Sequence, residues 1–549
     1  MNHQRHHILT STIKLAFIFI NIRLFYWQII QGPQLRKQAL SQTQKIQKID
    51  PQRGNILTSD GFPLATNQNS YQLSLYKPNL ETPLDQVIDQ IDNIKPDFAI
   101  NHGDLIDKFK NNPQQLWISF PIHFTTKEKD ILSAPGISFQ TTTYRLYAED
   151  QLAQNIIGRL GQNQQGAQIG YGGLEAYYDK QLRGQTGFIK TAKDATGQTI
   201  LSQKIWQSDT RNGRHLHTFL NRKIQFLVEQ KLKQGIETYS AESGSIIVTD
   251  PTNGSIIAMT SLSATSSATK SAHTNFAISH LFEPGSIFKP LIVAMALDNQ
   301  SVNLDYTCPQ CDRPRTIGQY TINNWDMETN PDINLKDTLK NSDNISMSFI
   351  IDALGQSEFL KYFDQLNLNK KTGIDLQGEA KPLAKSFWSH IDLATASFGQ
   401  GFAITQLQMI HAFNAIANNG HTVKPQVVSY FSENNKIINN KTGPKTKIFS
   451  LKTTNQIKEF LQYTVENSNL EKLRPKDLEV CGKSGTAQIA QHGQYQESST
   501  IASFIGFSPC QQPGFSLIVT LVKPQTSTWG STTAAPIWFD LAKQITHLL

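Results

Sequence analysis

The pattern of apolar and polar residues is most distinctive at the N-terminus, where residues 8–30 are mostly apolar and are interrupted by Lys14 and Arg23. A helix needs about 20 apolar residues to cross a bilayer, and this stretch is long enough if the Arg23 side chain reaches towards a membrane surface. The last part of this stretch contains an aromatic run of the kind found at membrane interfaces. No small-x-small cleavage site follows the stretch. We therefore expect an uncleaved single-pass anchor over residues 8–30, a cytoplasmic tail over 1–7 and the bulk of the chain outside the cytoplasm.

The stretch after the anchor is more polar. Residues 32–49 are rich in Gln and predict a helical stalk. Residues 53–57 and 62–65 flank an Asp60-Gly61 turn, a pattern that predicts two strands joined by that turn. Residues 66–215 mix short predicted strands with polar helices and contain no catalytic constellation. We assign residues 31–215 to one mixed α/β domain.

A different pattern begins near residue 216 and predicts an α+β domain over residues 216–549. Apolar residues at helical spacing predict an amphipathic helix over residues 221–235, at Ile224, Phe226, Leu227 and Leu232. Residues 245–249 and 256–259 flank an Asp-Pro-Thr-Asn-Gly turn and predict a hairpin. Helical segments extend to about residue 420, and further strands are predicted near residues 480–490, 501–507 and 515–522. A hairpin, a helical block and later strands indicate one sheet packed with helices.

Composition narrows the possible functions. The chain has 549 residues, of which 38% are hydrophobic and 17% charged, so it can form ordinary cores in two or three domains. Its net charge of +7 is a mild excess that we expect to be spread along the chain, and no basic run interleaved with aromatics indicates nucleic-acid binding.

The four cysteines do not predict a metal site. Cys308 and Cys311 form a single CxxC without the two further ligands that structural zinc requires, and no HExxH motif is present. For this pair a local disulfide and two free thiols both remain open. Cys481 and Cys510 can meet only if the strands that contain them pair. We expect no cofactor and no metal.

The strongest chemical signal is Ser286, which follows a Pro284-Gly285 turn and is predicted to lie at the start of a helix that continues into an apolar segment. Lys289 lies three residues later, on the same face of such a helix. A serine needs an adjacent base to act as a nucleophile, and an unprotonated lysine can provide it. Ser-x-x-Lys also occurs at Ser74 and Ser267, where neither Pro-Gly nor an apolar helix accompanies it.

Two further motifs follow in order. Ser342-Asp343-Asn344 lies in a predicted helical stretch, and Lys483-Ser484-Gly485-Thr486 lies on a predicted strand with a partner strand after it. Literal Lys-Thr-Gly triplets at 371–373 and 441–443 are rejected, because the first lies in a turn and the second precedes Pro444. With SxxK, SxN and K(T/S)G in this order, the chain resembles the penicillin-binding protein and serine β-lactamase superfamily.

The resemblance covers nearly the whole chain and is to class B penicillin-binding proteins, as shown by the anchor, Arg53-Gly54, Gly173-Leu174-Glu175, residues 254–259, Ser397 to Gly401 and Ala534-Ala535-Pro536. It implies an elongated pedestal or dimerisation domain at residues 31–215. It implies a serine β-lactamase-like transpeptidase domain at 216–549, with an antiparallel sheet flanked by helices. Since residues 31–215 lack glycosyltransferase motifs, polymerisation is expected to belong to a partner.

The resemblance also implies roles for the site residues. Ser286 would attack the penultimate D-alanine of a peptidoglycan stem peptide, release the last D-alanine and pass the acyl group to an amine of a neighbouring stem. Lys289 would be the base, with its pKa lowered by burial and by the nearby Lys483. Ser342 and Asn344 would relay a proton and bind the substrate amide. Substrate binding would involve Lys483, Ser484, Gly485 and Thr486. The N–H groups of Ser286 and Thr486 would form an oxyanion hole. Asp343 would support the loop.

The implied ligands and partners are stem peptides, lipid-linked glycan, β-lactams, a SEDS-type membrane glycosyltransferase and other wall-synthesis proteins, at the periplasmic side of the bacterial inner membrane. Two rival functions remain. One is a D,D-carboxypeptidase or endopeptidase of the same fold, and the other is a non-enzymatic membrane scaffold or β-lactam sensor. A β-lactamase is disfavoured because no deacylating base can be identified.

Overall fold

The computed structural model describes residues 2–549 except 97, 133, 150–151, 165–167, 194–198, 265–273, 383–384, 441–442 and 492–493. The alternative Ser-x-x-Lys at 267–270 lies outside the described residues, as do two positions of the triplet at 441–443. The chain forms two compact units. The smaller unit comprises Met1–Arg53 and Arg183–Gly213, and the larger unit comprises Gly54–Leu182 and Arg214–Leu549.

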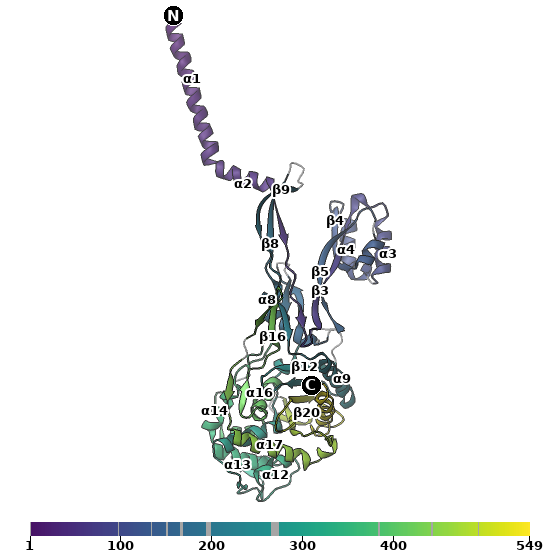
Figure 1. The fold of residues 1–549 in the computed structure, drawn as a ribbon, viewed down its shortest axis with the longest axis vertical. Coiled ribbons are helices and arrows are strands. Elements are labelled where there is room, and N and C mark those ends of the chain that lie inside the picture. Colours follow the sequence, from purple (N-terminus) through teal and green to yellow (C-terminus); the bar gives the residue numbers. More distant parts are fainter. Residues whose placement is uncertain are drawn as a thin grey trace. The chain divides into compact units, whose positions relative to one another are not determined.

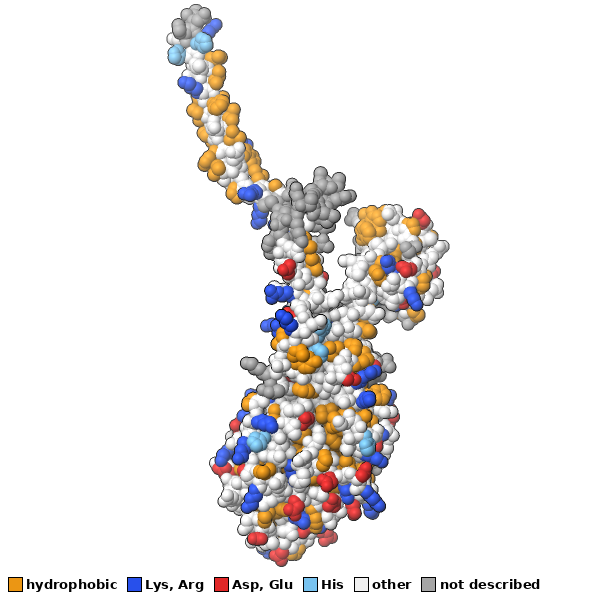
Figure 2. Space-filling view, in the orientation of Figure 1, with side chains coloured by type: hydrophobic (Ala, Val, Ile, Leu, Met, Phe, Trp, Pro, Cys, Tyr) orange, Lys and Arg blue, Asp and Glu red, His pale blue; other side chains and the backbone are white. Residues whose placement is uncertain are grey.

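The expected apolar helix is present in the smaller unit. Helix α1 (Asn2–Phe25) continues into one π-helical turn, η1 (Tyr26–Ile30), as Figure 1 shows. Apolar side chains lie along much of its surface (Figure 2). Among the described residues it is the one helix long and apolar enough to cross a membrane. The guanidinium of Arg23 lies over the rings of Tyr26 and Trp27, at 5.9 and 5.5 Å from their centres. A cation beside two interfacial aromatics is how an arginine is accommodated near the end of a span.

The prediction of a helix over residues 32–49 is only partly correct. Helix α2 (Gly32–Thr43) is followed by strand β1 (Gln44–Ile49), which pairs antiparallel with β8 (Gly187–Lys193), and β8 pairs with β9 (Thr199–Ser208). The register runs from Gln44 opposite Ala192 to Ile49 opposite Gly187. Residues 44–49 are a strand because a distant segment completes their hydrogen bonds, and a local pattern cannot reveal that partner.

A mixed sheet in the larger unit joins strands from both halves of the chain. Strand β10 (His215–Thr218) pairs in parallel with β2 (Ile56–Leu57) and antiparallel with β16 (Val428–Glu433), which pairs with β17 (Lys436–Asn439). Strand β2 pairs with β3 (Pro63–Tyr76), which also pairs with β4 (Trp117–Phe124) and β5 (Ile137–Tyr147).

The expectation of only short strands before residue 215 is wrong for β3 and β5, which contain 14 and 11 residues. They pair continuously from Ala65 opposite Tyr147 to Leu75 opposite Ile137. Polar residues occupy much of β3, so its length depends on this pairing rather than on apolar alternation. Helices α3 (Leu84–Ile94) and α4 (Phe98–Asn111) pack on β3 and β4 around a separate apolar core.

The predicted hairpin and late strands form one five-stranded antiparallel sheet, which confirms those expectations. Its order is β12 (Ile256–Ser263), β11 (Ser243–Thr249), β21 (Phe515–Val522), β20 (Gln494–Ser508) and β19 (Cys481–Gln491). Strand alternation sends Ile246 and Leu517 into one core with α9 (Arg222–Tyr239) and α18 (Ala534–Thr546). Ile247 and Ile518 enter the other core with α11 (Lys289–Asp298) and α16 (Gln406–Ala417).

One assignment in the predicted helix over residues 221–235 is wrong. Helix α9 buries Ile224, Leu227, Val228 and Leu232, but the Phe226 side chain is 59% exposed. Residues three and four apart share a helix face, and Phe226 lies off the face that the other four define. The Asn221 side chain caps this helix by accepting from the N–H groups of Lys223 and Ile224.

The cysteines form two disulfides. Cys308 is bonded to Cys311, and Cys481 is bonded to Cys510, with Cα–Cα distances of 5.7 and 5.3 Å. The second bond links the first residue of β19 to the segment that follows β20. Strand pairing places these two cysteines together, since Cys481 lies opposite Phe507 in the β19–β20 register.

We predict that Trp538→Ala lowers the free energy of unfolding by about 3–5 kcal/mol. The Trp538 side chain is fully buried against Phe504 and Phe539, and its indole N–H donates to the Leu517 carbonyl at 2.7 Å. Chemical denaturation of the full-length protein measures the change. The control Phe226→Ala removes an exposed ring and should change stability by less than about 0.5 kcal/mol. Equal losses in the two variants would contradict this description of the core.

Candidate active site

Ser286 lies on a tight turn that leads directly into a buried helix. Residues Gly285–Phe288 form one 3₁₀ turn, η5, and Lys289 is the first residue of α11. Ser286 therefore precedes the α-helix, whereas the sequence predicted it at the helix start. Gly285 has a φ of +60°, a conformation that glycine adopts without steric cost. Ser286 is partly exposed, whereas Ile287 and Phe288 are buried. The packing of these two apolar side chains in the core holds the turn in place.

Glycines allow two segments to approach the Ser286 turn closely. The Gly285 N–H donates to the Gly399 carbonyl at 3.0 Å, and a methyl group on Gly399 would overlap the Gly285 backbone. On the other side, a methyl group on Gly485 would come within 3.1 Å of the Ile287 backbone nitrogen. Any larger residue at these positions would separate the segments. The backbone of β19 therefore runs directly against the turn that carries Ser286.

The Lys289 ammonium group is enclosed by the second motif. Its Nζ donates to the Ser342 carbonyl at 2.6 Å, the Ser342 hydroxyl at 3.1 Å and the Asn344 Oδ1 at 2.7 Å. Burial lowers the Lys289 pKa well below its ordinary value, and the positive charge of Lys483 lowers it further, while the Asp343 carboxylate opposes the shift. An amine in this position is readily held in its neutral, basic form.

The second motif occupies a break between two helices rather than the interior of one helix. Helix α12 (Leu335–Asn341) ends at Ser342, which has the left-handed values φ +57° and ψ +42°. Helix α13 (Asn344–Leu354) begins two residues later. The change of direction turns both the carbonyl and the hydroxyl of Ser342 towards Lys289. A non-glycine residue in this conformation is uncommon and often marks a functional position.

The Asp343 carboxylate holds this break together. It caps α13 by accepting from the Ser346 N–H at 2.7 Å. It also accepts from the side-chain amides of Asn324 and Asn330, at 2.7 and 2.8 Å. These bonds tie the loop around residues 323–330 to the second motif.

The third motif lies on β19, as predicted. Lys483 and Thr486 are opposite Ile505 and Ala502 of β20. The Lys483 Nζ donates to the Ser484 carbonyl at 2.9 Å, and burial lowers the pKa of Lys483 to about 8. The Thr486 hydroxyl oxygen accepts from the Gly530 N–H at 3.0 Å, so its own proton can be donated to another group.

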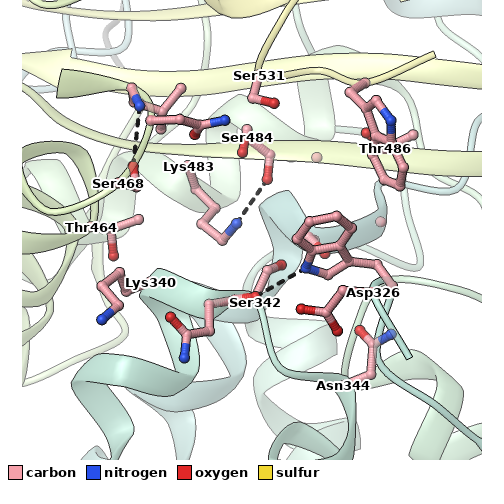
Figure 3. A pocket seen from close by; sticks show the side chains of 18 of the residues that line it. Asp326, Lys340, Ser342, Asn344, Thr464, Ser468, Lys483, Ser484, Thr486 and Ser531 are labelled. Atoms are coloured by element: carbon pink, nitrogen blue, oxygen red, sulfur yellow. Dashed lines mark hydrogen bonds between the residues drawn. The ribbon is translucent and has the colours of Figure 1, made fainter. Parts of the chain in front are cut away.

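The three motifs converge on one cavity of about 560 Å³. Side chains from the helix break and β19 face it (Figure 3). Its lining includes Ser286, Ser342, Asn344, Lys483, Ser484, Gly485 and Thr486. Lys289 lies behind Ser342 and Asn344, to which it is hydrogen-bonded. Ser286 and Lys483, which are far apart in the sequence, therefore line one cavity, and the Lys289 amine contacts two of the other lining residues. The rejected alternatives differ, since Ser74 lies within β3 and residues 371–373 form a loop outside the cavity lining.

Several residues that line the cavity have no recognisable signal in the sequence. Trp325 and Trp529 meet edge to face with ring centres 5.2 Å apart, and Asp326 and Lys340 contribute charges. The Trp325 indole N–H donates to the Asn341 carbonyl at 3.2 Å, next to Ser342. These residues lie in loops or at helix ends, where no periodicity or motif spacing indicates a common position. Phe398 and Gln400 also line the cavity and belong to the segment that carried part of the family resemblance.

Two family models match the chain. Residues 244–545 match the model described as penicillin binding protein transpeptidase domain, and residues 48–218 match the penicillin-binding protein dimerisation domain. The expected arrangement of an apolar N-terminal helix, a pedestal-type domain and a C-terminal domain with an antiparallel sheet and helices is confirmed.

Individual proteins match over nearly the full chain. Stage V sporulation protein D of Bacillus subtilis is 27% identical over 95% of this chain and 82% of its own. The peptidoglycan D,D-transpeptidase FtsI of Escherichia coli K12 is 26% identical over 97% of this chain and 89% of its own. Among solved structures, penicillin binding protein 2X of Streptococcus thermophilus has a TM-score of 0.74 at 22% identity, covering 92% of this chain and 80% of that one.

We predict that Asp343→Ala slows acylation of the protein by a penicillin at least tenfold and lowers the free energy of unfolding by about 1–3 kcal/mol. The substitution removes a helix cap and leaves two side-chain amides without their acceptor. Stopped-flow acylation and denaturation measure the two effects. Asp298→Ala is the matched control, because the Asp298 carboxylate also accepts hydrogen bonds at a helix N-terminus, from the Ser450 N–H and the Thr453 hydroxyl, and is no part of the cavity lining. Unchanged acylation in Asp343→Ala would show that the bonds to Asn324 and Asn330 do not shape the site.

Proposed function

The chain belongs to the penicillin-binding protein transpeptidase family, and on this premise we propose that Ser286 is the nucleophile of its reaction. The protein is a membrane-anchored peptidoglycan D,D-transpeptidase, a serine acyltransferase that binds β-lactams. The observation that carries our assignment of Ser286 is the enclosed Lys289 amine, held by Ser342 and Asn344 beside the cation of Lys483.

In the proposed first half-reaction, the Ser286 Oγ attacks the carbonyl carbon of the penultimate D-alanine of a stem peptide. Its proton passes to the neutral Lys289 Nζ. The oxyanion accepts hydrogen bonds from the backbone N–H groups of Ser286 and Thr486, each contributing about 3–4 kcal/mol in acyl transfer. The C–N bond then breaks, and the terminal D-alanine leaves after receiving a proton from Lys289 by way of the Ser342 hydroxyl.

In the proposed second half-reaction, the amine of a neighbouring stem attacks the Ser286 ester. Lys289, neutral again, accepts the proton that this amine loses and returns it to the departing Ser286 oxygen. During both steps the Asn344 amide group holds the substrate backbone. Lys483 and the Thr486 hydroxyl bind the terminal carboxylate of the donor peptide, with Ser484 and Gly485 forming the adjoining wall.

The alternative use of water as acceptor would make the protein a D,D-carboxypeptidase. We propose amine transfer because it is the reaction named for the relative FtsI. We expect Ser286→Ala to abolish labelling by a fluorescent penicillin and Ser74→Ala, at the alternative Ser-x-x-Lys, to leave it unchanged. If the Ser286→Ala variant is still labelled, Ser286 is not the nucleophile.

The reaction type is tested separately with the wild-type protein and a stem-peptide substrate. We expect cross-linked dimers and free D-alanine, measured by mass spectrometry of the products. Release of D-alanine with only trimmed monomers would identify a carboxypeptidase and leave Ser286 as the nucleophile.

We predict a bell-shaped dependence of the acylation rate constant on pH. Acylation needs neutral Lys289, so the rate rises as pH increases through the lowered pKa of that amine. Carboxylate binding needs protonated Lys483, so the rate falls as pH increases beyond about 8. Stopped-flow acylation across the pH range measures both limbs.

The alkaline limb has a specific control. In Lys483→Arg the cation persists, and the fall above pH 8 should disappear. Lys458 also has a pKa lowered to about 8 by burial, but it donates to Asn419 and Gln511, away from the cavity. Lys458→Met should therefore retain the alkaline limb. Retention of that limb in Lys483→Arg would contradict our role for Lys483.

We further propose that residues 1–7 are cytoplasmic, that residues 8–30 cross the inner membrane, and that the pedestal (31–215) and transpeptidase domain (216–549) are periplasmic. The site of peptidoglycan cross-linking supports this orientation. Alkaline phosphatase fused to the C-terminus should be active, since that enzyme matures only outside the cytoplasm. An inactive but intact fusion would reverse the orientation.

The glycan strands must come from another enzyme, for which we propose a membrane-embedded SEDS-type glycosyltransferase. The two matched domains, at residues 48–218 and 244–545, account for most of the chain and support this division of labour. Crosslinking of the full-length protein in membranes should recover such a partner, and recovery of only soluble proteins would argue against it.

A further inference from the structure

Positive charge is concentrated in the smaller unit, and the expectation that the excess is spread along the chain is wrong. Residues 1–53 and 183–213 contain 13 Lys and Arg and three Asp, a net charge of +10. The rest of the chain contains 38 Lys and Arg and 41 Asp and Glu, a net charge of −3. The basic character of this protein therefore belongs to the unit that contains the membrane helix and the segments next to it.

Several of these basic side chains form no ion pair within the part of the chain that the structure describes. Arg36, Lys37, Lys48 and Arg211 are exposed and Lys190 is half-buried, and none of the five forms an ion pair with another described residue. In the larger unit many Lys and Arg side chains are paired with carboxylates, as Lys95 is with Glu128. We name Arg36, Lys37, Lys48, Lys190 and Arg211 the juxtamembrane basic surface. Figure 2 shows Lys and Arg side chains along the chain that follows the N-terminal helix.

Two of the lysines lie on one face of the three-stranded sheet. Lys48 is directly opposite Phe188, and Lys190 is directly opposite Ile46, so Lys48 and Lys190 are diagonal neighbours on the same face. Such neighbours are about 7–8 Å apart between Cα atoms, and like charges at this spacing repel each other. A phosphate group between them would convert the repulsion into two favourable contacts.

The position of the surface indicates the source of that phosphate. Arg36 and Lys37 follow the last residue of the membrane helix, Ile30, by only six and seven positions. At a rise of about 1.5 Å per helical residue they lie at most roughly 10 Å from it, close to the screening length of about 8 Å at physiological salt. They are thus within electrostatic reach of lipid headgroups. Lys and Arg normally gather on the cytoplasmic side of a membrane span. In the orientation proposed above, Arg36 and Lys37 lie on the opposite side, so this positive-inside preference does not explain their position.

We propose that the juxtamembrane basic surface binds the phosphate groups of anionic phospholipids in the membrane that α1 crosses. The expected ligand is a phosphatidylglycerol-type headgroup, which has a net negative charge, in preference to the zwitterionic phosphatidylcholine. Binding would hold α2 and the β1–β8–β9 sheet against the bilayer surface. This surface is separate from the cavity of Ser286, so the proposal stands whether or not the proposed catalytic roles do.

The test uses the full-length protein in a neutral detergent with equal amounts of phosphatidylglycerol and phosphatidylcholine of the same acyl chains. Native mass spectrometry counts the lipids that remain bound. We expect phosphatidylglycerol to exceed phosphatidylcholine at least tenfold, since each Lys or Arg near an anionic surface contributes a factor of about five. The excess should fall towards one in a variant that combines Arg36→Gln, Lys37→Gln, Lys48→Gln and Lys190→Gln.

A matched variant neutralises four exposed lysines of the larger unit, by Lys452→Gln, Lys472→Gln, Lys476→Gln and Lys543→Gln. It should retain the preference for phosphatidylglycerol, and thermal unfolding of both variants establishes that they are folded. Equal binding of the two lipids by the wild type, or an equal loss in the two variants, would overturn the proposal. Displacement of phosphatidylglycerol by equimolar inorganic pyrophosphate would also overturn it, because the surface would then be a pyrophosphate site.

Discussion

The geometry of the active site depends on one buried amine. Moving an ammonium group out of water costs several kcal/mol even in a relaxed protein interior, and a second cation nearby adds to that cost. The Lys289 Nζ is fully buried, has Lys483 as a positive neighbour, and is surrounded by carbonyl and hydroxyl oxygens that accept hydrogen bonds from either protonation state. The fold thereby makes loss of the proton favourable, which is the property that a general base requires.

That arrangement is maintained by apolar packing far larger than the site. Residues 290–297 of α11 are buried, so the helix that begins with Lys289 cannot shift to let water reach the amine. The facing acceptors come from a helix break that is itself fixed by Asp343. Each acceptor belongs to an element packed in the same core. The packing of the whole transpeptidase domain therefore offsets the energetic cost of the buried amine.

Local sequence patterns predicted those parts of the fold in which the pattern and the packing agree. The hairpin around Asp250 and the strands near residues 501–507 and 515–522 have strong turn signals and buried apolar runs, and both appear as expected. The three motifs could be assembled because serine, lysine and asparagine occur in a fixed order. Residues 44–49 were mispredicted because their partner strand lies more than 130 residues away.

The sequence was least informative about backbone conformation and loop position. Nothing in the residue type of Ser342 indicates a left-handed conformation, which arises where α12 ends and α13 begins. Trp325 and Trp529 meet only because two unrelated loops fold over the same cavity. Such contacts are determined by tertiary packing, and a single sequence contains no spacing rule for them.

The glycine contacts around Ser286 limit how this active site can change. Positions 285, 399 and 485 are closed to larger residues, because the chain segments on either side already touch. Adaptation to a different antibiotic or peptide must therefore use the loops over the cavity, where Trp325, Trp529 and Ser531 have room for other side chains. Substitutions are therefore sterically restricted at the turn that carries Ser286 and less restricted in the loops over the cavity.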